Sequence, residues 1–460
     1  MMILKKSLRK AIANIHILII GIYLLPYGAI RLQEGMCMKI NPLYLFLPMI
    51  EALDIEEHDL VGSTAGHGAR TAYLAYTMAK NLNWSRNQLL DFSLSALLHD
   101  CGSVETIRNM RDAAKRGVPF TASFSNGTIV TDASIHAQLG ENIIRNLPFY
   151  SSVKGVIQMH HEHADGSGPM GLTEGMIDER AQILYLADRM DIWYDLLSLS
   201  EEGFHQMMAD FRKKIHHEFT GMAIELMNRS LTYTHMQAIQ HCPINSLLKE
   251  ILPQRLDEYT MDDMLALTTF FERIVDNKSS FTKVHSHGIA MKALRLSAYY
   301  KWEEEKRERF LLAASLHDYG KLRIDSAILE KAGPLTDEEF QTMKTHVRWT
   351  YEVLNDIPGF EDIRDWASFH HEKLDGSGYF KGLKGEALSF ESRLMACIDI
   401  YQALTEKRPY KVGYSHDKSI HIMEEMAKDG KIDGSIVNDM NQFFWTQRTG
   451  NTRLYGSKMT

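Results

Sequence analysis

Residues 313–322 of this chain read AASLHDYGKL, and residues 95–104 read SALLHDCGSV. In both stretches an apolar run leads into an adjacent histidine and aspartate, and each pair belongs to a longer series that occurs twice. A lone histidine precedes the pair by 32 residues in both series (67 to 99, 285 to 317). A later histidine precedes a His-His pair by 24 residues in both (136 to 160, 346 to 370). Repetition over such a length indicates a duplicated domain.

The repeated residues are imidazole and carboxylate side chains. The first series consists of His67, His99, Asp100, His136, His160, His161 and Asp188. The second consists of His285, His317, Asp318, His346, His370, His371 and Asp399. Such groups at fixed offsets are typical of a metal site built from several helices, and a carboxylate can bridge two cations. The donor set favours Fe, Mn or Zn over Mg, which prefers oxygen ligands. A purely structural polar core would bury these groups at a high cost.

The composition predicts an ordinary globular protein with a helical architecture. Of the 460 residues, 45% are hydrophobic and 24% are charged, which allows a sizeable core. Apolar residues recur at helical intervals over 65–82 and 88–98, and again over 289–300 and 310–316. Turn signals interrupt these runs, and strand-like alternation is scarce. We therefore predict an all-α fold of two tandem helical bundles whose ligands project inward.

The predicted organisation has five parts. They are a hydrophobic leader over 1–37, a first domain over 38–191, a helical connecting region over 192–262, a second domain over 263–445 and a polar tail over 446–460. Thr336, followed three residues later by Glu339, indicates a helix start. The His416-Asp417 pair is interpreted as part of a helix beginning capped by Ser415, not as a further metal site.

The net charge of −8 argues against a DNA or RNA polymer as partner, because phosphate neutralisation requires a clustered basic excess. The four cysteines show no CxxC spacing, which fits a reducing cytosol. We therefore predict a cytoplasmic protein. Residues 11–30 could still bring it into contact with a membrane, because they form an apolar segment after a basic stretch. Three interpretations stay open for this segment: a membrane anchor, a membrane-surface or packed helix, and an extension upstream of the true start.

The second series lies within sequence that resembles the HD-GYP phosphodiesterases, a branch of the HD-domain metal-dependent phosphohydrolases that hydrolyse cyclic dinucleotides. The resemblance extends over about residues 278–412. It is carried by VHSHGIA (284–290), AASLHDYGKL (313–322), ILEKAGPLTDEEF (328–340), MKTHV (343–347), FHHEKLDGSGYFKGLKGE (369–386) and DIYQALTEKRPY (399–410). Long ordered matches of this kind are far more specific than a single His-Asp dipeptide.

The resemblance implies roles for particular residues. All seven members of the second series would be metal ligands, with Asp318 as the bridging carboxylate and Lys321 near the scissile phosphate. The substrate pocket would involve Asp375, Gly376, Gly378, Tyr379 and Arg408. Members of the family with three metals carry a glutamate where this chain has Phe281. We therefore expect two divalent metal ions, Fe or Mn, and a cyclic dinucleotide substrate.

The chain departs from the family pattern in both domains. The GYP signature is Gly378-Tyr379-Phe380 here, which leaves the substrate preference open. The first domain keeps every candidate ligand but has Ser103 in place of the lysine, and Pro169 in place of the tyrosine. We therefore assign the chemistry to the second domain and regard the first series as a possible second metal site.

Three functional hypotheses follow. The first is a metal-dependent phosphodiesterase that hydrolyses a cyclic dinucleotide such as cyclic di-GMP in the second domain. The second keeps the metal site but makes the protein an HD-type nucleotide phosphohydrolase. The third is a non-catalytic nucleotide-binding sensor. Turnover of cyclic dinucleotides compared with nucleoside monophosphates separates the first two. Calorimetry on residues 50–250 tests the third, because absence of both metal and nucleotide binding would leave only a structural role for that half.

Overall fold

The computed structural model of the chain describes residues 38–48, 50, 64–117, 122–123, 129–130, 135–278, 285–331, 333–406 and 412–449. The apolar segment 11–30, Phe281 and Arg408 lie outside these residues. The predicted all-α fold is confirmed: across the described part of the chain, strands form only two short two-stranded antiparallel ribbons, and helices form the rest of the architecture. No helix among the described residues is long and apolar enough to cross a membrane.

The first group of helices carries the first series of histidines and aspartates. It comprises α3 (His67–Ala79), α4 (Arg86–Leu97), α5 (Ser103–Lys115), α6 (Ile135–Ile144) and α7 (Glu179–Trp193). Helix α3 packs against α4 and α7, and α5 packs against α6. The ribbon of β2 (Ala122–Ser123) and β3 (Ile129–Val130) lies between α5 and α6 in the sequence.

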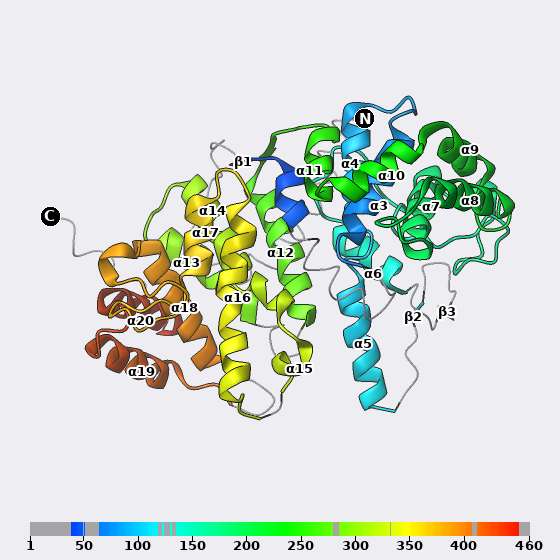
Figure 1. Cartoon of the computed structure of the whole chain (residues 1–460). Coiled ribbons are helices and arrows are strands. Elements are labelled where there is room, and N and C mark those ends of the chain that lie inside the picture. Colours follow the sequence, from blue (N-terminus) through cyan, green and yellow to red (C-terminus); the bar gives the residue numbers. More distant parts are fainter. Residues whose placement is uncertain are drawn as a thin grey trace.

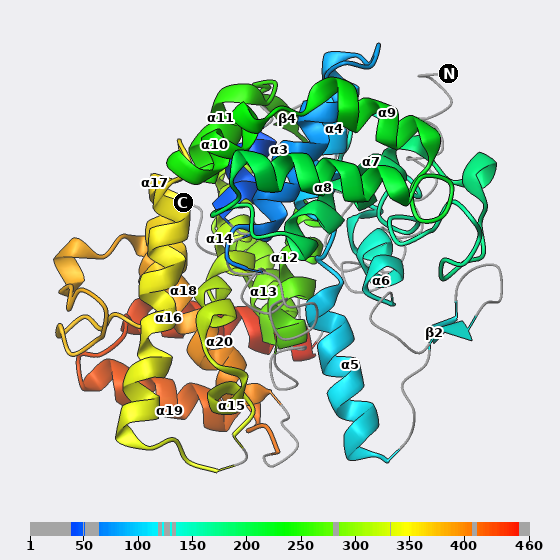
Figure 2. The same ribbon diagram turned by 45° about the vertical axis from the view of Figure 1, so that its right-hand side comes forward.

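Four helices follow the first group in the sequence. They are α8 (Glu201–Lys213), α9 (Gly221–Ser230), α10 (Tyr233–His241) and α11 (Ile244–Ile251). Helix α9 packs against α3 and α7, and α11 packs against α3, so these helices gather beside the first group (Figure 2). The methionines of this region, among them Met207, Met227 and Met236, are fully buried and serve as core residues.

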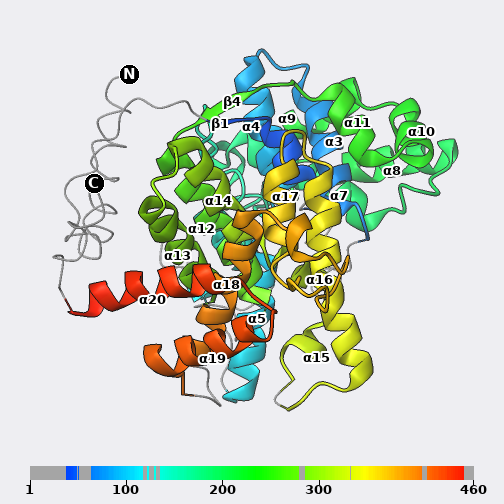
Figure 3. The ribbon, with the colours of Figure 1, turned by 90° about the vertical axis from the view of Figure 1, so that its left-hand side faces the viewer.

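The second group carries the second series. It comprises α12 (Met261–Lys278), α13 (His285–Tyr299), α14 (Glu304–Leu316), α15 (Ser326–Leu329), α16 (Asp337–Asn355), α17 (Glu361–Ser368), α18 (Phe390–Thr405), α19 (His416–Lys428) and α20 (Gly434–Thr449). Helix α13 packs against α14 and α18, as α3 packs against α4 and α7 in the first group. Helices α19 and α20 pack against α18 at the C-terminal end (Figure 3).

Capping side chains fix where several of these helices begin. Thr336 accepts a hydrogen bond from the backbone N–H of Glu339, whose side chain accepts in turn from the backbone N–H of Thr336. This reciprocal capping box starts α16 at the predicted place and thereby sets the position of His346. The Ser415 side chain accepts a hydrogen bond from the backbone N–H of Lys418 and caps the N-terminus of α19, as the sequence indicated.

The two groups lie side by side, and α12 is the helix of the second group that lies at their boundary (Figure 1). Helix α12 packs against α13 and α14 of its own group and against α5 and α6 of the first. Across the α5–α12 contact, Arg273 donates to Glu105 over 2.8 Å, and the Asn277 amide donates to the same carboxylate over 3.0 Å. Glu105 lies only two residues beyond the first residue of α5, close to the first His-Asp pair.

The N-terminal described segment also packs on the second group. Strand β1 (Met38–Ile40) pairs antiparallel with β4 (Asp257–Tyr259), the strand directly before α12. Phe46 packs edge-on against Phe270 of α12, with ring centroids 5.6 Å apart. One continuous hydrophobic core therefore runs through both groups of helices.

Candidate metal centres

The candidate ligands of the second centre lie on or directly beyond the ends of five helices. His285 begins α13, the His317-Asp318 pair directly follows α14, and His346 lies on α16. His370 and His371 follow α17, and Asp399 lies on α18. Six of the seven side chains are buried, and His371 is partly buried. The fold thus brings residues that are more than 100 positions apart into one buried cluster.

The carboxylate of Asp318 lies at the middle of this cluster. One of its oxygens, Oδ2, is 3.1 Å from His317 Nε2, and the other, Oδ1, is 3.4 Å from His346 Nε2. His285 Nε2 lies 3.9 Å from Asp318 Oδ2 and 3.2 Å from Asp399 Oδ1. Separations of roughly 3–3.5 Å are those of donor atoms that share one cation at about 2.1 Å from each.

The donor atoms fall into two sets, each with its members within 4.8 Å of one another. One set is His346, His370 and His371, and the other is His285, His317 and Asp399. Because Asp318 contacts a member of both sets, its two oxygens can each face one set. This arrangement fits two cations joined by a bridging carboxylate.

The orientation of the imidazole rings also fits metal binding. The Nδ1 atoms of His317, His346 and His370 each face the backbone carbonyl three residues earlier, at 2.7–2.8 Å. A carbonyl only accepts, so each Nδ1 carries the proton and each Nε2 presents a lone pair. These three Nε2 atoms are buried and have no hydrogen-bond partner in the structure. Such unsatisfied buried atoms would be costly unless a cation met them.

The protonation states of His346, His371 and Asp318 agree with this donor set, whereas His285 must lose a proton before it can bind a cation. Burial lowers the pKa of His346 to about 4 and that of His371 to about 3, so both rings are neutral at pH 7. Burial alone would raise the pKa of Asp318, but neighbouring His317 and Lys321 hold it well below its usual range. Burial would lower the pKa of His285, yet hydrogen bonds to Asp399 and Glu406 raise it to about 9.

The first centre repeats the same arrangement. His67 begins α3, the His99-Asp100 pair follows α4, His136 lies on α6, His160 and His161 lie in the turn before α7, and Asp188 lies on α7. Asp100 is again central, with Oδ1 2.9 Å from His136 Nε2 and Oδ2 3.1 Å from His99 Nε2. Every member of the first series except the partly buried His161 is buried.

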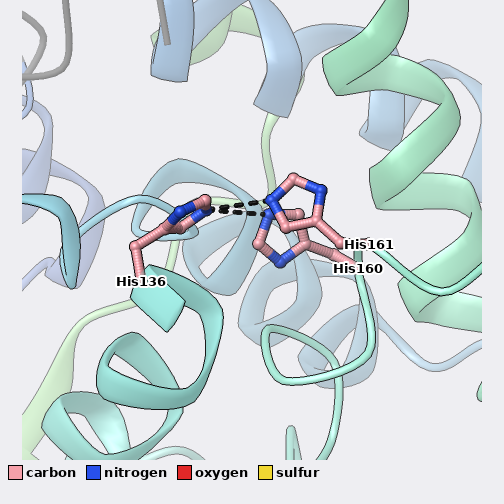
Figure 4. A group of neighbouring side chains, drawn as sticks. All are labelled: His136, His160 and His161. Carbon is pink, nitrogen blue, oxygen red and sulfur yellow. Dashed lines mark hydrogen bonds between the residues drawn. The ribbon is translucent and has the colours of Figure 1, made fainter. Parts of the chain in front are cut away.

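Three imidazoles of the first centre converge on one point (Figure 4). His136 Nε2 lies 3.4 Å from His160 Nε2 and 3.0 Å from His161 Nε2. Burial lowers the pKa of His160 to about 3, so this ring is neutral at pH 7. On the other side, the Nε2 atoms of His67 and His99 are buried without a hydrogen-bond partner. The first series therefore has the same geometric fit to cations as the second.

Two carboxylates that hold a ligand histidine were not anticipated from the sequence. His67 Nδ1 lies 2.8 Å from Asp191 Oδ2, and His285 Nδ1 lies 2.9 Å from Glu406 Oε2. Asp191 comes three residues after the ligand aspartate of its helix, whereas Glu406 comes seven residues after Asp399. The supporting carboxylate therefore lies on α7 in the first domain and directly after the last residue of α18 in the second. An acidic residue three or seven positions after the repeated aspartate is the feature of the sequence by which these two carboxylates could have been found.

The residues predicted to shape a substrate pocket lie in a loop after the His-His pair. Glu372 holds this loop, because its carboxylate accepts hydrogen bonds from the backbone N–H groups of Lys381, Gly382 and Leu383 at 2.7–3.2 Å. Gly378 allows the loop to pass close to this glutamate, since a Cβ there would lie 2.4 Å from Glu372 Cα. Glu372 follows the two histidines directly, and its role was not predicted from the sequence.

Within the same loop, Asp375 accepts a hydrogen bond from the backbone N–H of Ser377 over 2.8 Å, and Gly376 has a left-handed φ of 83°. The ring of Tyr379 stacks on His371, with centroids 4.7 Å apart. The next residue, Phe380, has φ of 100°, whereas proline requires a φ near −65°. The turn is therefore built differently from one that carries proline at this position.

Comparison with known proteins agrees with this architecture. Residues 64–193 and 269–436 each match the HD domain family. The chain therefore belongs to the HD-domain proteins and carries two such domains in tandem. The predicted duplication is confirmed, and so is the predicted resemblance of the chain to HD-domain phosphodiesterases.

These relatives are phosphodiesterases. The chain is 28% identical to 3'3'-cGAMP-specific phosphodiesterase 1 of Vibrio cholerae over 88% of this chain and 93% of the relative. It is 38% identical to the cyclic di-GMP phosphodiesterase response regulator RpfG of Xanthomonas campestris, over 31% of this chain and 37% of that protein. The crystal structure of a cyclic GMP-AMP specific phosphodiesterase of V. cholerae (V-cGAP3) has the same fold, with a TM-score of 0.57. The match covers 87% of this chain and 97% of that chain at 22% identity.

Proposed function

We propose that this protein hydrolyses a phosphodiester bond of a cyclic dinucleotide at a dinuclear metal centre in its second HD domain, with Fe or Mn as the metal. The observation that carries this proposal is the position of Asp318 between two sets of metal-binding side chains. The relative that matches nearly the whole chain is named a 3'3'-cGAMP-specific phosphodiesterase, which supports the substrate class.

Each side chain of the centre has a proposed part in metal binding. His346, His370 and His371 would hold one cation and His285, His317 and Asp399 the other, with Asp318 shared between them. When bound, two such cations supply a hydroxide nucleophile and stabilise the charge on the phosphate oxygens. Hydrogen bonds from Nδ1 to backbone carbonyls keep the histidine rings in the required tautomer.

Lys321 is proposed to neutralise the phosphate during the reaction. Its Nζ donates to Asp318 Oδ2 over 2.5 Å, and its side chain is 19% exposed, so its charge lies between the centre and solvent. Tyr379, stacked on His371, offers an aromatic face beside the same centre. Lys344 adds a second positive charge, because its Nζ lies 5.5 Å from the centre of the Tyr379 ring. We propose that Asp375, Gly376 and Gly378 shape the loop that presents this tyrosine, and that Arg408 contributes to substrate binding.

The test is turnover by the full chain loaded with Fe(II) or Mn(II). We expect linear dinucleotide as the product, and both cyclic di-GMP and 3'3'-cGAMP should be assayed because relatives of both specificities match. Absence of turnover for every cyclic dinucleotide, with metal shown to be bound, would overturn the proposal. A preference for nucleoside monophosphates by orders of magnitude would favour the nucleotide phosphohydrolase alternative.

A second metal site in the first domain is also proposed. It is supported by the two unsatisfied buried Nε2 atoms of His67 and His99 and by the convergence of His136, His160 and His161. Metal analysis of the full chain tests it directly: we expect more than two equivalents of Fe or Mn per chain. A maximum of two equivalents, all of them lost on replacement of second-domain ligands, would contradict this site.

A further inference from the structure

The first domain lacks two side chains that the second domain places beside its metal centre. Ser103 stands where the second domain has Lys321, and it is fully buried at the start of α5. Pro169 stands where the second domain has Tyr379. At these two corresponding positions, the first domain therefore lacks the positively charged side chain and the aromatic ring that the second domain has.

Helix α7 supplies a positively charged side chain, Arg189, next to the first centre. The guanidinium of Arg189 donates to Asp188 Oδ2 through Nη2 at 2.6 Å and Nε at 3.0 Å. The other oxygen of that carboxylate, Oδ1, faces His67 Nε2 at 3.4 Å. The Arg189 side chain is 19% exposed, the same fraction as that of Lys321. In the second domain the corresponding residue of α18 is Ile400, so the positive charge at this position is specific to the first domain.

Helix α7 also brings an aromatic ring to the first centre. Tyr185, one helical turn before Arg189, packs edge-on to His161 with centroids 6.1 Å apart. Its hydroxyl and His163 Nε2 are hydrogen-bonded at 3.0 Å, and the Arg189 guanidinium lies 5.6 Å from its ring centre. The corresponding residue of the second domain is Ala396. The second histidine of the His-His pair thus has a tyrosine neighbour in both domains, from the loop in one and from α7 in the other.

We infer that the first centre is a second phosphate-binding site, in which Arg189 and Tyr185 of α7 take the places that Lys321 and Tyr379 have in the second domain. The ligand class is a phosphate-bearing nucleotide. A guanidinium presents a planar set of donors that matches phosphate oxygens, and a tyrosine ring offers a face or edge to a base. The inference rests on the proposed metal site of the first domain.

The structure offers matched substitutions, because each domain carries the residue that the other lacks. Arg189→Ile introduces the residue of the second domain at this place, and Lys321→Ser introduces that of the first. Both are made in the full chain loaded with Mn(II), and inorganic phosphate is the probe, titrated by calorimetry. Metal content is measured on each sample.

We expect two phosphate-binding events in the unmodified protein. Lys321→Ser should weaken one of them and Arg189→Ile the other, each about tenfold or more, as expected for loss of a charged hydrogen-bond donor. Arg189→Lys should recover part of the lost affinity, since it restores the charge without the planar geometry. Unchanged phosphate affinity in Arg189→Ile with metal still bound would overturn the inference.

A second pair of variants covers the case in which Arg189→Ile loses metal. Arg189→Gln keeps a hydrogen-bond donor beside Asp188, and Tyr185→Ala introduces the residue of the second domain without altering the ion pair. If both retain metal and bind phosphate as the unmodified protein does, the inference is wrong. Turnover of cyclic dinucleotide by the unmodified protein is measured on the same preparation. Turnover together with a single phosphate event that no α7 variant affects would overturn this inference and leave the proposed function intact.

Discussion

The backbone carbonyl of His346 lies directly against Gly320: a Cβ on this glycine would be 1.9 Å from the carbonyl oxygen. The first domain has the same relationship between Gly102 and His136, with a distance of 2.1 Å. The turn after each His-Asp pair therefore packs without a side chain against the helix that carries the next histidine. This close approach sets the separation between Asp318 and His346.

Gly320→Ala tests the importance of this packing. The added methyl group must displace backbone, so we expect the free energy of unfolding to fall by about 1–3 kcal/mol, the usual cost of overpacking. The affinity of the second centre for Mn(II) should fall as well. Denaturant unfolding and metal titration measure the two effects. Gly333→Ala is the matched control, because nothing lies within 4 Å of a Cβ at that position. Equal stability of the two variants would show that the turn can move freely.

Asp318→Ala removes the carboxylate proposed to be shared by the two cations. Turnover of cyclic dinucleotide should fall at least ~10³-fold, given the several kcal/mol that metal activation supplies. Asp100→Ala should reduce this turnover far less, since it alters the other centre. Circular dichroism must show that both variants keep their helices, because loss of a ligand can unfold a metal-dependent domain. A folded Asp318→Ala that keeps its rate, beside an inactive folded Asp100→Ala, would reverse the assignment of the domains.

Glu406→Gln weakens the hydrogen bond that orients His285. We expect the metal affinity of the second centre to fall by roughly 10–100-fold, the usual effect of removing a partner of a ligand histidine. Asp191→Asn is the corresponding change in the first domain and should affect only the first centre. Competition with a chelator, followed by metal analysis, measures both affinities. If Glu406→Gln instead lowers the metal content of the first centre, the two centres do not respond independently.

Phe380→Pro restores the proline of the GYP signature at a backbone position that cannot hold it. Because φ at this residue is 100° and proline requires about −65°, we expect a loss of more than about 1 kcal/mol in unfolding free energy. Phe380→Ala is the control, since it also removes the ring contact with Tyr351 but permits the original backbone. Thermal unfolding of the two variants measures the difference. A proline variant as stable as the alanine variant would mean that the loop can adopt the family's turn without cost.

The sequence predicted the fold class and the duplication because both depend on periodic signals: helical spacing of apolar residues, and histidines at equal offsets in two places. It also predicted which histidines and aspartates would meet, since the structure gathers both series into buried clusters. It did not reveal Asp191 or Glu406, because these two carboxylates lie at different offsets from the repeated aspartate and break the repeat. The sequence did not point to Arg189 and Tyr185 for a related reason: the corresponding residues of the second domain, Ile400 and Ala396, are of a different type.

The packing of residues 38–48 on β4 and α12 has a consequence for how this protein is made. Met38 pairs with Tyr259, and Phe46 packs on Phe270, so the beginning of the described chain needs partners from its second half. At about 5–20 residues per second, a ribosome takes roughly ten to forty seconds to synthesise the intervening chain. During that interval the apolar side chains of this segment lack their final neighbours. Although the sequence divides into two repeats, residues 38–48 cannot reach their final packing until the second repeat has begun to leave the ribosome.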